Sequence, residues 1–247
     1  MDVAAYAVEA EAEQTHWWFV GRRRLFAREI AKLGLDRSAS VLDVGSSTGT
    51  NLRLLRDEGY QLINGLDFSD ESIRWCAQKA LPPVRKGDVC ALPFGDNSFD
   101  LVLATDIIEH VDDDQQAIRE IQRVLKPGGH VLITVPTFAA LWGLQDVKAH
   151  HKRRYRMARL LDVVRGGNME TVRSYYFNFI LFVPIWLARR IIDLIRVDLD
   201  SEVQVNSSSI NRLLSWIFTV DLALAPVLRV PFGVSALVVA KRPTHVA

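Results

Sequence analysis

Cysteine is scarce in this chain of 247 residues, and its charges nearly cancel. The two cysteines, Cys76 and Cys90, are too few for a disulfide framework and lack metal-type spacing, so we expect a reducing, cytoplasmic environment. The formal net charge is +1, which provides no overall field that would attract nucleic acid. Residues 1–14 lack the basic-then-apolar order of a signal peptide.

Long hydrophobic runs are also missing. The stretch YYFNFILFVPIWLA (residues 175–188) has 14 residues without a charge and is interrupted by Pro184. It is shorter than the roughly 20 residues that cross a bilayer. A second apolar stretch, residues 210–228, contains Asp221. Three interpretations remain open: the two stretches form a lid or dimer surface, they belong to the core, or they lie in a membrane interface. The last would place Trp186, Arg189, Arg190 and Arg196 near head groups.

The remaining pattern is that of an α/β protein. From Ser40 to Pro136, short apolar runs alternate with amphipathic segments. This alternation predicts a layered, mostly parallel sheet. We expect an N-terminal helical lead or lid at residues 1–38 and a core at residues 39–177. An apolar helical insertion is expected at residues 178–231, and a last core strand at residues 232–247.

The turn after the first predicted strand has the sequence VLDVGSSTGTNL, residues 41–52. Gly45 permits a tight exit from the strand, and Gly49 allows the following helix to pack closely. Ser47 stands where a dinucleotide loop needs glycine for close approach to a pyrophosphate. Asp43 would repel a pyrophosphate but attract an ammonium group. A ligand with an amino-acid end and a nucleoside end, such as S-adenosylmethionine (SAM), fits this turn.

Two further acids follow the next predicted strands. Asp67 ends the second strand, where a carboxylate can accept from both ribose hydroxyls. Asp88 follows the third strand and is placed to accept from the exocyclic amine of adenine. Val89 would offer backbone groups to the ring, and Phe68 an apolar face. Neighbouring strand ends form the expected ligand crevice of such a sheet.

These motifs together resemble the class I SAM-dependent methyltransferases over about residues 41–136. The matching segments are VLDVGSSTG, GLDFS, GDVCALPFGDNSFDLVLATDIIEHV and LKPGGHVLITVP. The resemblance implies a Rossmann-like seven-stranded sheet whose last strand is antiparallel. It also implies methionine near Asp43, Gly45 and Gly49. Ser46 and Ser47 depart from the usual small residue and glycine, so we expect altered cofactor contacts. The expected cofactor-binding residues are Asp43, Gly45, Ser46, Ser47, Gly49, Asp67, Phe68, Asp88, Val89 and Thr105.

The segment ATDIIEHV, residues 104–111, directly follows the fourth predicted strand. Methyl transfer to oxygen requires alignment and removal of a proton. We predict His110 as the base and Glu109 beside it, since an unperturbed histidine pKa of about 6.5 lies near working pH. The expected site contains no metal. One alternative is a divalent cation on Asp106, Glu109 and His110, resembling the E-x-x-E-H site of some ubiquinone-biosynthesis O-methyltransferases. Another is that Glu109 and His110 only shape the pocket floor or cap a helix.

Two aromatic and basic clusters flank the core: HWWFVGRRR at residues 16–24 and AHHKRRYRMARLL at residues 149–161. Both resemble segments of type-11 or type-23 bacterial methyltransferases of cell-envelope or quinone type. Aromatic rings beside guanidinium groups suit a lid over a planar or anionic acceptor. The alternative is that the aromatic residues fix the first helix to the sheet. The expected acceptor contacts are Trp17, Arg22, His151, Arg154 and Tyr155.

The function expected from these observations is O-methylation of a small or lipid-linked acceptor of quinol, polyprenyl-linked or sugar type. C-methylation of a quinone ring and a non-catalytic SAM-binding or membrane-associated module remain open. Ser47 and Asp88 disfavour a nicotinamide-dependent oxidoreductase. We expect a cytoplasmic protein that can lie at the inner membrane surface through residues 178–231, and a homodimer remains open.

Overall fold

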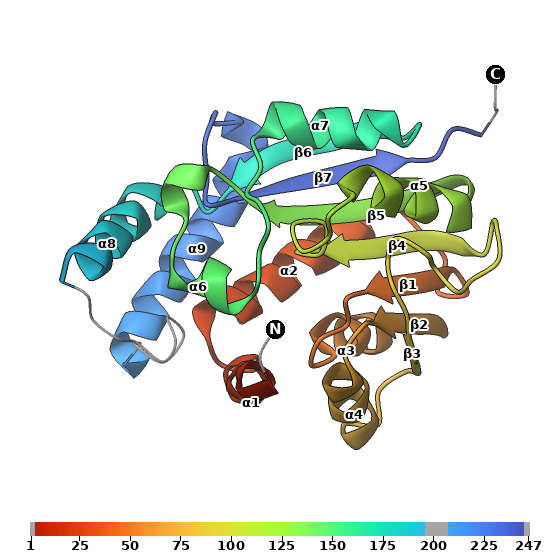
Figure 1. Cartoon of the computed structure of the whole chain (residues 1–247), viewed down its shortest axis with the longest axis horizontal. Coiled ribbons are helices and arrows are strands. Elements are labelled where there is room, and N and C mark those ends of the chain that lie inside the picture. The colour runs from red at the N-terminus through yellow and green to blue at the C-terminus, as the bar shows by residue number, and fades with distance from the viewer. Residues whose placement is uncertain (1–2, 196–206, 245–247) are drawn as a thin grey trace.

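The computed structural model describes residues 3–195 and 207–244, so Arg196 lies outside the described residues. Seven strands form one sheet in the order β3-β2-β1-β4-β5-β7-β6 (Figure 1). β1 pairs in parallel with β2 and β4, whereas β7 is antiparallel to both β5 and β6. The predicted fold class is therefore confirmed. The strands are β1 (Ser40–Val44), β2 (Leu62–Asp67), β3 (Val84–Lys86), β4 (Phe99–Thr105), β5 (Leu125–Pro136), β6 (Glu170–Phe177) and β7 (Ser235–Lys241).

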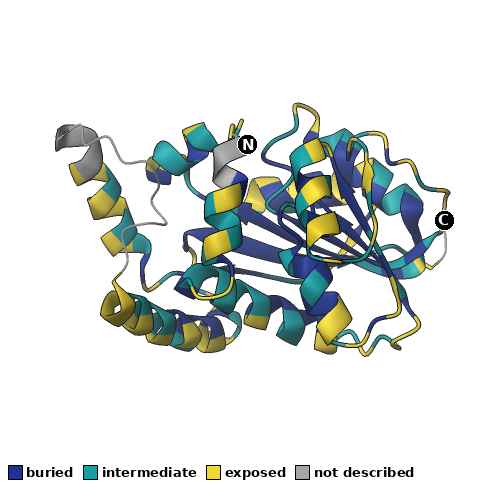
Figure 2. Cartoon of the chain, turned by 90° about the horizontal axis from the view of Figure 1, so that it is seen from below, coloured by how far each residue is buried: buried dark blue, intermediate teal, exposed yellow. Residues whose placement is uncertain are grey.

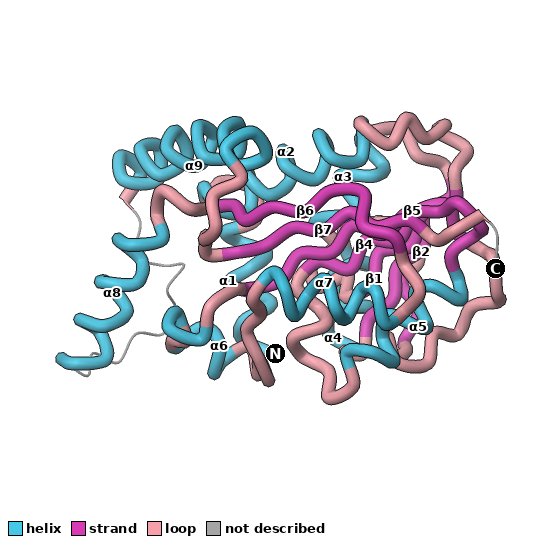
Figure 3. The backbone as a smooth tube through the Cα atoms, turned by 90° about the horizontal axis from the view of Figure 1, so that it is seen from above, coloured by secondary structure: helices cyan, strands magenta, loops and turns pink. Residues whose placement is uncertain are grey.

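Helices cover both faces of this sheet, as the tube view shows (Figure 3). α5 (Asp114–Val124) and α7 (Met157–Gly166) pack on one face. α2 (Trp17–Ala31), α3 (Thr50–Asp57) and α9 (Ser208–Leu228) pack on the other. The remaining helices are α1 (Val3–Ala12), α4 (Asp70–Gln78), α6 (Leu144–Lys148) and α8 (Phe182–Ile195), with a short 3-10 turn at Ala139–Leu141.

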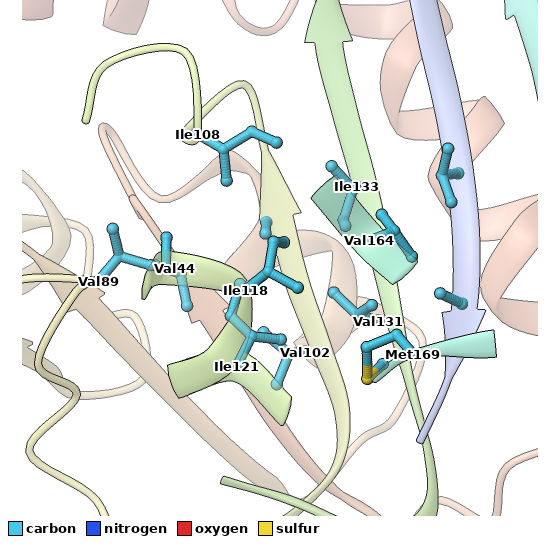
Figure 4. Close-up of a cluster of buried hydrophobic side chains, with 14 of the residues drawn as sticks. Val44, Val89, Val102, Ile108, Ile118, Ile121, Val131, Ile133, Val164 and Met169 are labelled. Carbon is cyan, nitrogen blue, oxygen red and sulfur yellow. The ribbon is translucent and has the colours of Figure 1, made fainter. Parts of the chain in front are cut away.

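The central strand β4 explains why the core has two halves. Leu101 and Leu103 belong to the hydrophobic cluster under α2 and α9, whereas Val102 belongs to the cluster under α5 and α7. Successive side chains of a strand point to opposite faces, so an uninterrupted apolar run is required where both faces are covered. Figure 2 shows the sheet as a buried layer between helices, and Figure 4 shows Val102 beside Ile118 and Ile121 of α5.

The sequence predicts that Lys-Pro-Gly-Gly ends a helix and that a long loop follows residue 136, and the structure differs at both segments. The Lys-Pro-Gly-Gly segment lies inside β5, because pairing with β4 already begins at Leu125 opposite Phe99. The stretch expected to be one long loop before α7 contains the 3-10 turn and α6. α6 is short, and Asp146 within it accepts a hydrogen bond from the backbone N–H of Gly143 at 2.8 Å. A single buried carboxylate therefore organises this connection.

The two apolar segments form α8 and α9, which lie between β6 and β7 along the chain. Asp221, inside α9, is buried and accepts from the backbone N–H groups of Asn178 and Ile180 at 2.6 and 2.8 Å. It therefore fixes α9 to the chain that leaves β6. By length and composition alone, α9 could cross a membrane, although 22% of its most apolar window is buried in the protein. The exposed apolar residues of α8 and α9 are Val183, Trp186, Leu187, Ile191, Ile210, Leu213, Trp216, Leu224, Val227 and Leu228.

Candidate functional site

A cavity of about 1180 Å³ opens where β1, β2, β4 and β5 end at their carboxyl termini. This is the crevice expected for a ligand in an open α/β sheet. Its other walls come from α1, α2, the segment around α6, and α8. We refer to this cavity as the cleft.

The turn after β1 forms the floor of one end of the cleft. Gly45 has φ +75°, and a Cβ there would lie 1.7 Å from Cδ1 of Ile107, so only glycine fits. Ser47 itself adopts a left-handed conformation with φ 47°. Its hydroxyl donates to Glu9 of α1 at 3.0 Å. The serine that replaces glycine therefore keeps the glycine-like backbone and adds a contact to the N-terminal helix.

Asp67, at the end of β2, holds this turn together. Its two carboxylate oxygens accept from the backbone N–H groups of Ser47 and Ser69, both at 2.9 Å. Asp67 lines the cleft, and each of its oxygens has a second lone pair. The carboxylate is thus fixed by backbone groups and can still accept from a ligand hydroxyl.

Asp43 lies beneath the turn and is completely buried. One of its oxygens accepts from Nδ2 of Asn51 at 2.9 Å, and the other, Oδ2, has no hydrogen-bond partner among the described residues. Burial raises the pKa of Asp43 to about 6. Asn51 also donates to Oγ1 of Thr105 at 3.0 Å, which ties β1 to the end of β4. Asp43 and Gly49 do not line the cleft directly, unlike the other expected cofactor-binding residues.

The outer edge of this end of the cleft carries the predicted adenine contacts. Asp88 accepts from the backbone N–H of Cys90 at 2.8 Å, which fixes the turn after β3. Val89 is buried beside it, whereas Phe68 is 76% exposed. All three line the cleft, so the structure brings them together with Asp67 and the turn after β1.

Helix α1 closes over the turn after β1, and the sequence analysis assigned it no specific contact. Glu13 is 1% exposed and pairs with Arg53 and Lys79, both at 2.9 Å. It also accepts from the hydroxyl of Thr48 at 2.6 Å. Glu9 and Glu13 are one helical turn apart, which is the sequence signal that could have identified this acidic face.

The acceptor end of the cleft is centred on Glu109 and His110. Glu109 is completely buried, and neither carboxylate oxygen has a hydrogen-bond partner among the described residues. Burial, and then the charge of Asp106, raise the pKa of Glu109 well above its usual range. Burial, and then His151, lower the pKa of His110 to about 4. The imidazole of His110 is therefore neutral at neutral pH, and it is a weaker proton acceptor than an exposed histidine.

Asp106 is engaged elsewhere. Its carboxylate pairs with Arg22 of α2 at 2.5 Å and accepts from Oγ1 of Thr134 at 3.2 Å. The guanidinium of Arg22 lies over the rings of Trp18 and Phe26, at 5.4 and 5.1 Å from their centroids. Arg22 therefore lines the cleft as part of a neutralised pair.

Trp17 both fixes α2 and lines the cleft. Its ring meets Phe218 of α9 edge-on at 5.2 Å between centroids. Its backbone N–H donates to Oδ1 of Asn211 at 2.8 Å. Trp17 therefore fixes α2 to α9, and its contact with an acceptor stays a prediction.

Asp146 of α6 organises the second basic cluster, and the sequence analysis did not identify it. It lies 2.8 Å from Nδ1 of His151 and accepts from Nε and Nη2 of Arg154, both at 2.8 Å. Burial alone would raise the pKa of Asp146, but the hydrogen bonds from His151 and Arg154 hold it below its usual range. His151 and Arg154 line the cleft, and Arg154 is already engaged with this carboxylate. Their contact with an acceptor stays a prediction.

Tyr155 requires a correction. It was expected to contact the acceptor, but it is 1% exposed and does not line the cleft. Its hydroxyl hydrogen-bonds to Asp114 at 2.9 Å, inside the core under α5 and α7. An apolar ring with one satisfied hydroxyl is stable in the core, so the aromatic residue of a basic cluster need not face the ligand.

Comparison with known proteins agrees with this geometry. Residues 42–133 match the family model described as a methyltransferase domain. A malonyl-[acyl-carrier protein] O-methyltransferase of Pseudescherichia vulneris is 34% identical over 55% of this chain and 56% of its own length. A demethylmenaquinone methyltransferase of Renibacterium salmoninarum is 35% identical over 51% of each chain. This chain thus spans about half the length of these curated relatives.

A solved structure matches the fold over nearly its whole length. It comes from the complex between the Haloferax volcanii Trm112 methyltransferase activator and a methyltransferase. The TM-score is 0.66 at 21% identity, and the match covers 99% of this chain and 96% of the other. The match to the family model thus covers residues 42–133, and the sheet extends beyond that segment.

Proposed function

We propose that this chain, whose residues 42–133 belong to a methyltransferase domain family, binds SAM and transfers its methyl group to an oxygen of a small or lipid-linked acceptor. The observation that carries this proposal is the single cleft shared by the turn after β1, Asp67, Glu109 and His110. The cofactor end of the cleft suits a cationic nucleoside. The acceptor end carries side chains that can accept or donate a proton.

The cofactor end favours SAM over a phosphate ligand. The turn approaches the cleft through Gly45, but the unpartnered Oδ2 of Asp43 lies beneath it. A buried carboxylate without a partner is costly, and a nearby ammonium or sulfonium charge would offset that cost. Asp67 would accept from the ribose hydroxyls with its remaining lone pairs. SAM supplies the sulfonium methyl that is transferred.

At the acceptor end, Glu109 and the neutral His110 are the groups that would take a proton from the acceptor. Burial raises the pKa of Glu109 and lowers that of His110. Such groups can exchange a proton with a reacting hydroxyl. C-methylation of a quinone ring would use the same groups, and it remains the alternative.

A lipid-linked acceptor is supported by the apolar walls. Ile185 and Ala188 of α8 and Leu214 of α9 line the cleft, while other apolar side chains of both helices face outward. A contiguous exposed apolar surface next to a ligand cleft is typical of a membrane-interaction site. We therefore propose that the protein is cytoplasmic and lies peripherally at the inner membrane surface, with α8 and α9 against the lipid.

The activity is tested by SAM titration calorimetry together with a methyl-release assay on quinols and polyprenyl-linked sugars. We expect SAM binding that weakens at least tenfold, about 1.4 kcal/mol, in Asp67→Ala. The control is Asp57→Ala, because that carboxylate is on the surface and pairs with the exposed Arg56. Binding without methyl release on any lipid or metabolite extract would favour a non-catalytic module. Unchanged affinity in Asp67→Ala would contradict the ribose contact.

Membrane contact is tested by flotation with vesicles of phosphatidylglycerol and phosphatidylethanolamine. Wild type should float with the vesicles, and Leu213→Ser combined with Trp216→Ser should remain in the soluble fraction. Thr219→Ser, also on the exposed part of α9, is the matched control. If wild type stays soluble and is a dimer that the double variant dissociates, the apolar surface is a dimer interface instead.

A further inference from the structure

Glu109, His110 and His151 form a cluster at the acceptor end of the cleft. One ligand atom of each side chain lies within 4.8 Å of those of the other two. The two histidine rings meet edge-on at 4.7 Å between centroids. His151 belongs to the connection after α6, so the cluster joins segments that are far apart in the sequence.

The carboxylate of Glu109 is the strongest evidence for a ligand at this cluster. Both oxygens are buried, and neither has a hydrogen-bond partner among the described residues. Nε2 of His151 lies 4.0 Å from Oε1 of Glu109. Leaving a buried polar group unpaired costs about 1 to 3 kcal/mol when it is measured by mutation, and more when it is measured by transfer to an apolar solvent. A cation between these side chains would satisfy both oxygens and the facing nitrogen.

His151 is oriented through its other ring nitrogen. Nδ1 of His151 lies 2.8 Å from Asp146, which Arg154 holds in place. The His110 ring interacts with the backbone carbonyl of Ala149. Metal-binding histidines commonly use the second nitrogen in this way, on a carboxylate or a backbone carbonyl, so that the first points at the metal.

Asp106, Glu109 and His110, the set predicted from sequence to bind a divalent cation, do not form one cluster. Asp106 is neutralised by Arg22 at 2.5 Å, and its oxygens are not part of the cluster. His151 stands in its place. This exchange replaces an oxygen ligand by an imidazole, which disfavours magnesium and calcium and favours metals such as zinc, iron or nickel.

We propose that Glu109, His110 and His151 bind a divalent transition-metal ion, with Asp146 as the residue that positions His151. Tetrahedral zinc with bonds of about 2.1 Å separates its ligand atoms by about 3.4 Å. The present separations of up to 4.8 Å require the side chains to close by small rotations. Three protein ligands leave a coordination position open on the cleft side. Its use by the acceptor oxygen rests on the proposed methyltransferase function, whereas the metal site itself does not.

The experiment is metal binding to the full chain, prepared without a histidine tag and treated with chelator. Zinc is titrated by calorimetry, and cobalt by its visible absorption, which reports low coordination number. We expect one ion per chain, lost in His151→Ala and weakened at least tenfold in Glu109→Gln. Asp146→Asn should weaken binding by about ten- to a hundredfold, because the ring of His151 loses its anchor. Circular dichroism and SAM affinity verify that each variant is folded.

Two matched variants decide between ligand sets. His150→Ala, next to His151 but outside the cluster, should bind zinc as wild type does. Asp106→Asn should also retain zinc. The proposal is overturned if folded wild type binds no zinc or cobalt. It is equally overturned if binding survives His151→Ala but is lost in Asp106→Asn, which would assign the ion to Asp106. Metal binding without methyl transfer would count against the proposed function and leave this site standing.

Discussion

The turn after β1 and the connection around α6 both line the cleft, but they hold their carboxylates in different ways. Asp67 accepts from backbone N–H groups of Ser47 and Ser69. Asp146 is held mainly by side chains, those of His151 and Arg154. Backbone partners remain whatever the neighbouring side chains are, whereas side-chain partners depend on each residue's identity. The cofactor end should therefore be most sensitive to changes of backbone conformation, and the acceptor end to loss of a single charge.

The largest effect is expected at the acceptor end, in Asp146→Ala. This change leaves the buried Arg154 guanidinium, 3% exposed, without its carboxylate partner. Breaking a buried ion pair by removing one partner costs about 3 to 5 kcal/mol. Urea unfolding should show that loss, while the protein that remains folded binds SAM with wild-type affinity, because the turn after β1 is untouched.

Asp162→Ala is the matched control for this change. Asp162 pairs with Arg165 at 3.0 Å on the surface of α7, where both side chains are largely exposed. Removing such a pair should change the free energy of unfolding by less than about 1 kcal/mol. A loss of SAM affinity in Asp146→Ala as large as the loss of stability would mean that the two ends of the cleft are not independent.

An intermediate effect is expected from Gly45→Ala at the cofactor end. The new Cβ would meet Ile107 at 1.7 Å, and the backbone has φ +75°. Left-handed strain and overpacking together should cost about 2 to 4 kcal/mol. If the turn moves to relieve the contact with Ile107, the floor of the cleft is displaced, so SAM affinity should fall as well. Urea unfolding and calorimetry measure the two effects separately.

Gly59→Ala separates strain from crowding. Gly59 has φ +87°, but a Cβ there would find nothing within 4 Å. The strain alone should cost about 1 kcal/mol and leave SAM affinity unchanged. Equal losses in the two variants would show that backbone conformation, and not the space beside Ile107, limits the turn.

The same contrast explains what the sequence could predict. The sheet followed from apolar runs such as Leu101–Ala104, whose residues are all completely buried. The cofactor end also followed, because each of its acids lies within a few residues of a strand end. Local patterns are sufficient there, since a strand and its following turn are fixed by adjacent residues.

The acceptor end could not be predicted in this way. Arg22 meets Asp106 across 84 positions of sequence, and no local pattern relates the two. The basic cluster around Arg154 gave no sign that Asp146 would engage it, or that Tyr155 would turn into the core. These outcomes depend on which side chains meet in the folded chain, and a single sequence does not reveal such pairs.

The remaining expected effect is a pH dependence at the cofactor end. Burial raises the pKa of Asp43 to about 6, whereas hydrogen bonds hold that of Asp146 low. A raised pKa gives stability that is present below the unfolded value of 3.8 and is lost as pH rises through about 6. The lowered pKa of Asp146 has the opposite sign, so its contribution is present above the unfolded pKa and lost as pH falls.

SAM should reverse the penalty at Asp43, because the ionised carboxylate attracts its ammonium and sulfonium charges. Affinity should therefore increase about tenfold, or 1.4 kcal/mol, between about pH 5 and about pH 7. Asp43→Asn keeps an oxygen that can accept from Asn51, and its SAM affinity should not vary over this range. Calorimetry in matched buffers measures both slopes. If the two proteins show the same slope, the pH dependence belongs to another group, and the ammonium end of SAM does not lie near Asp43.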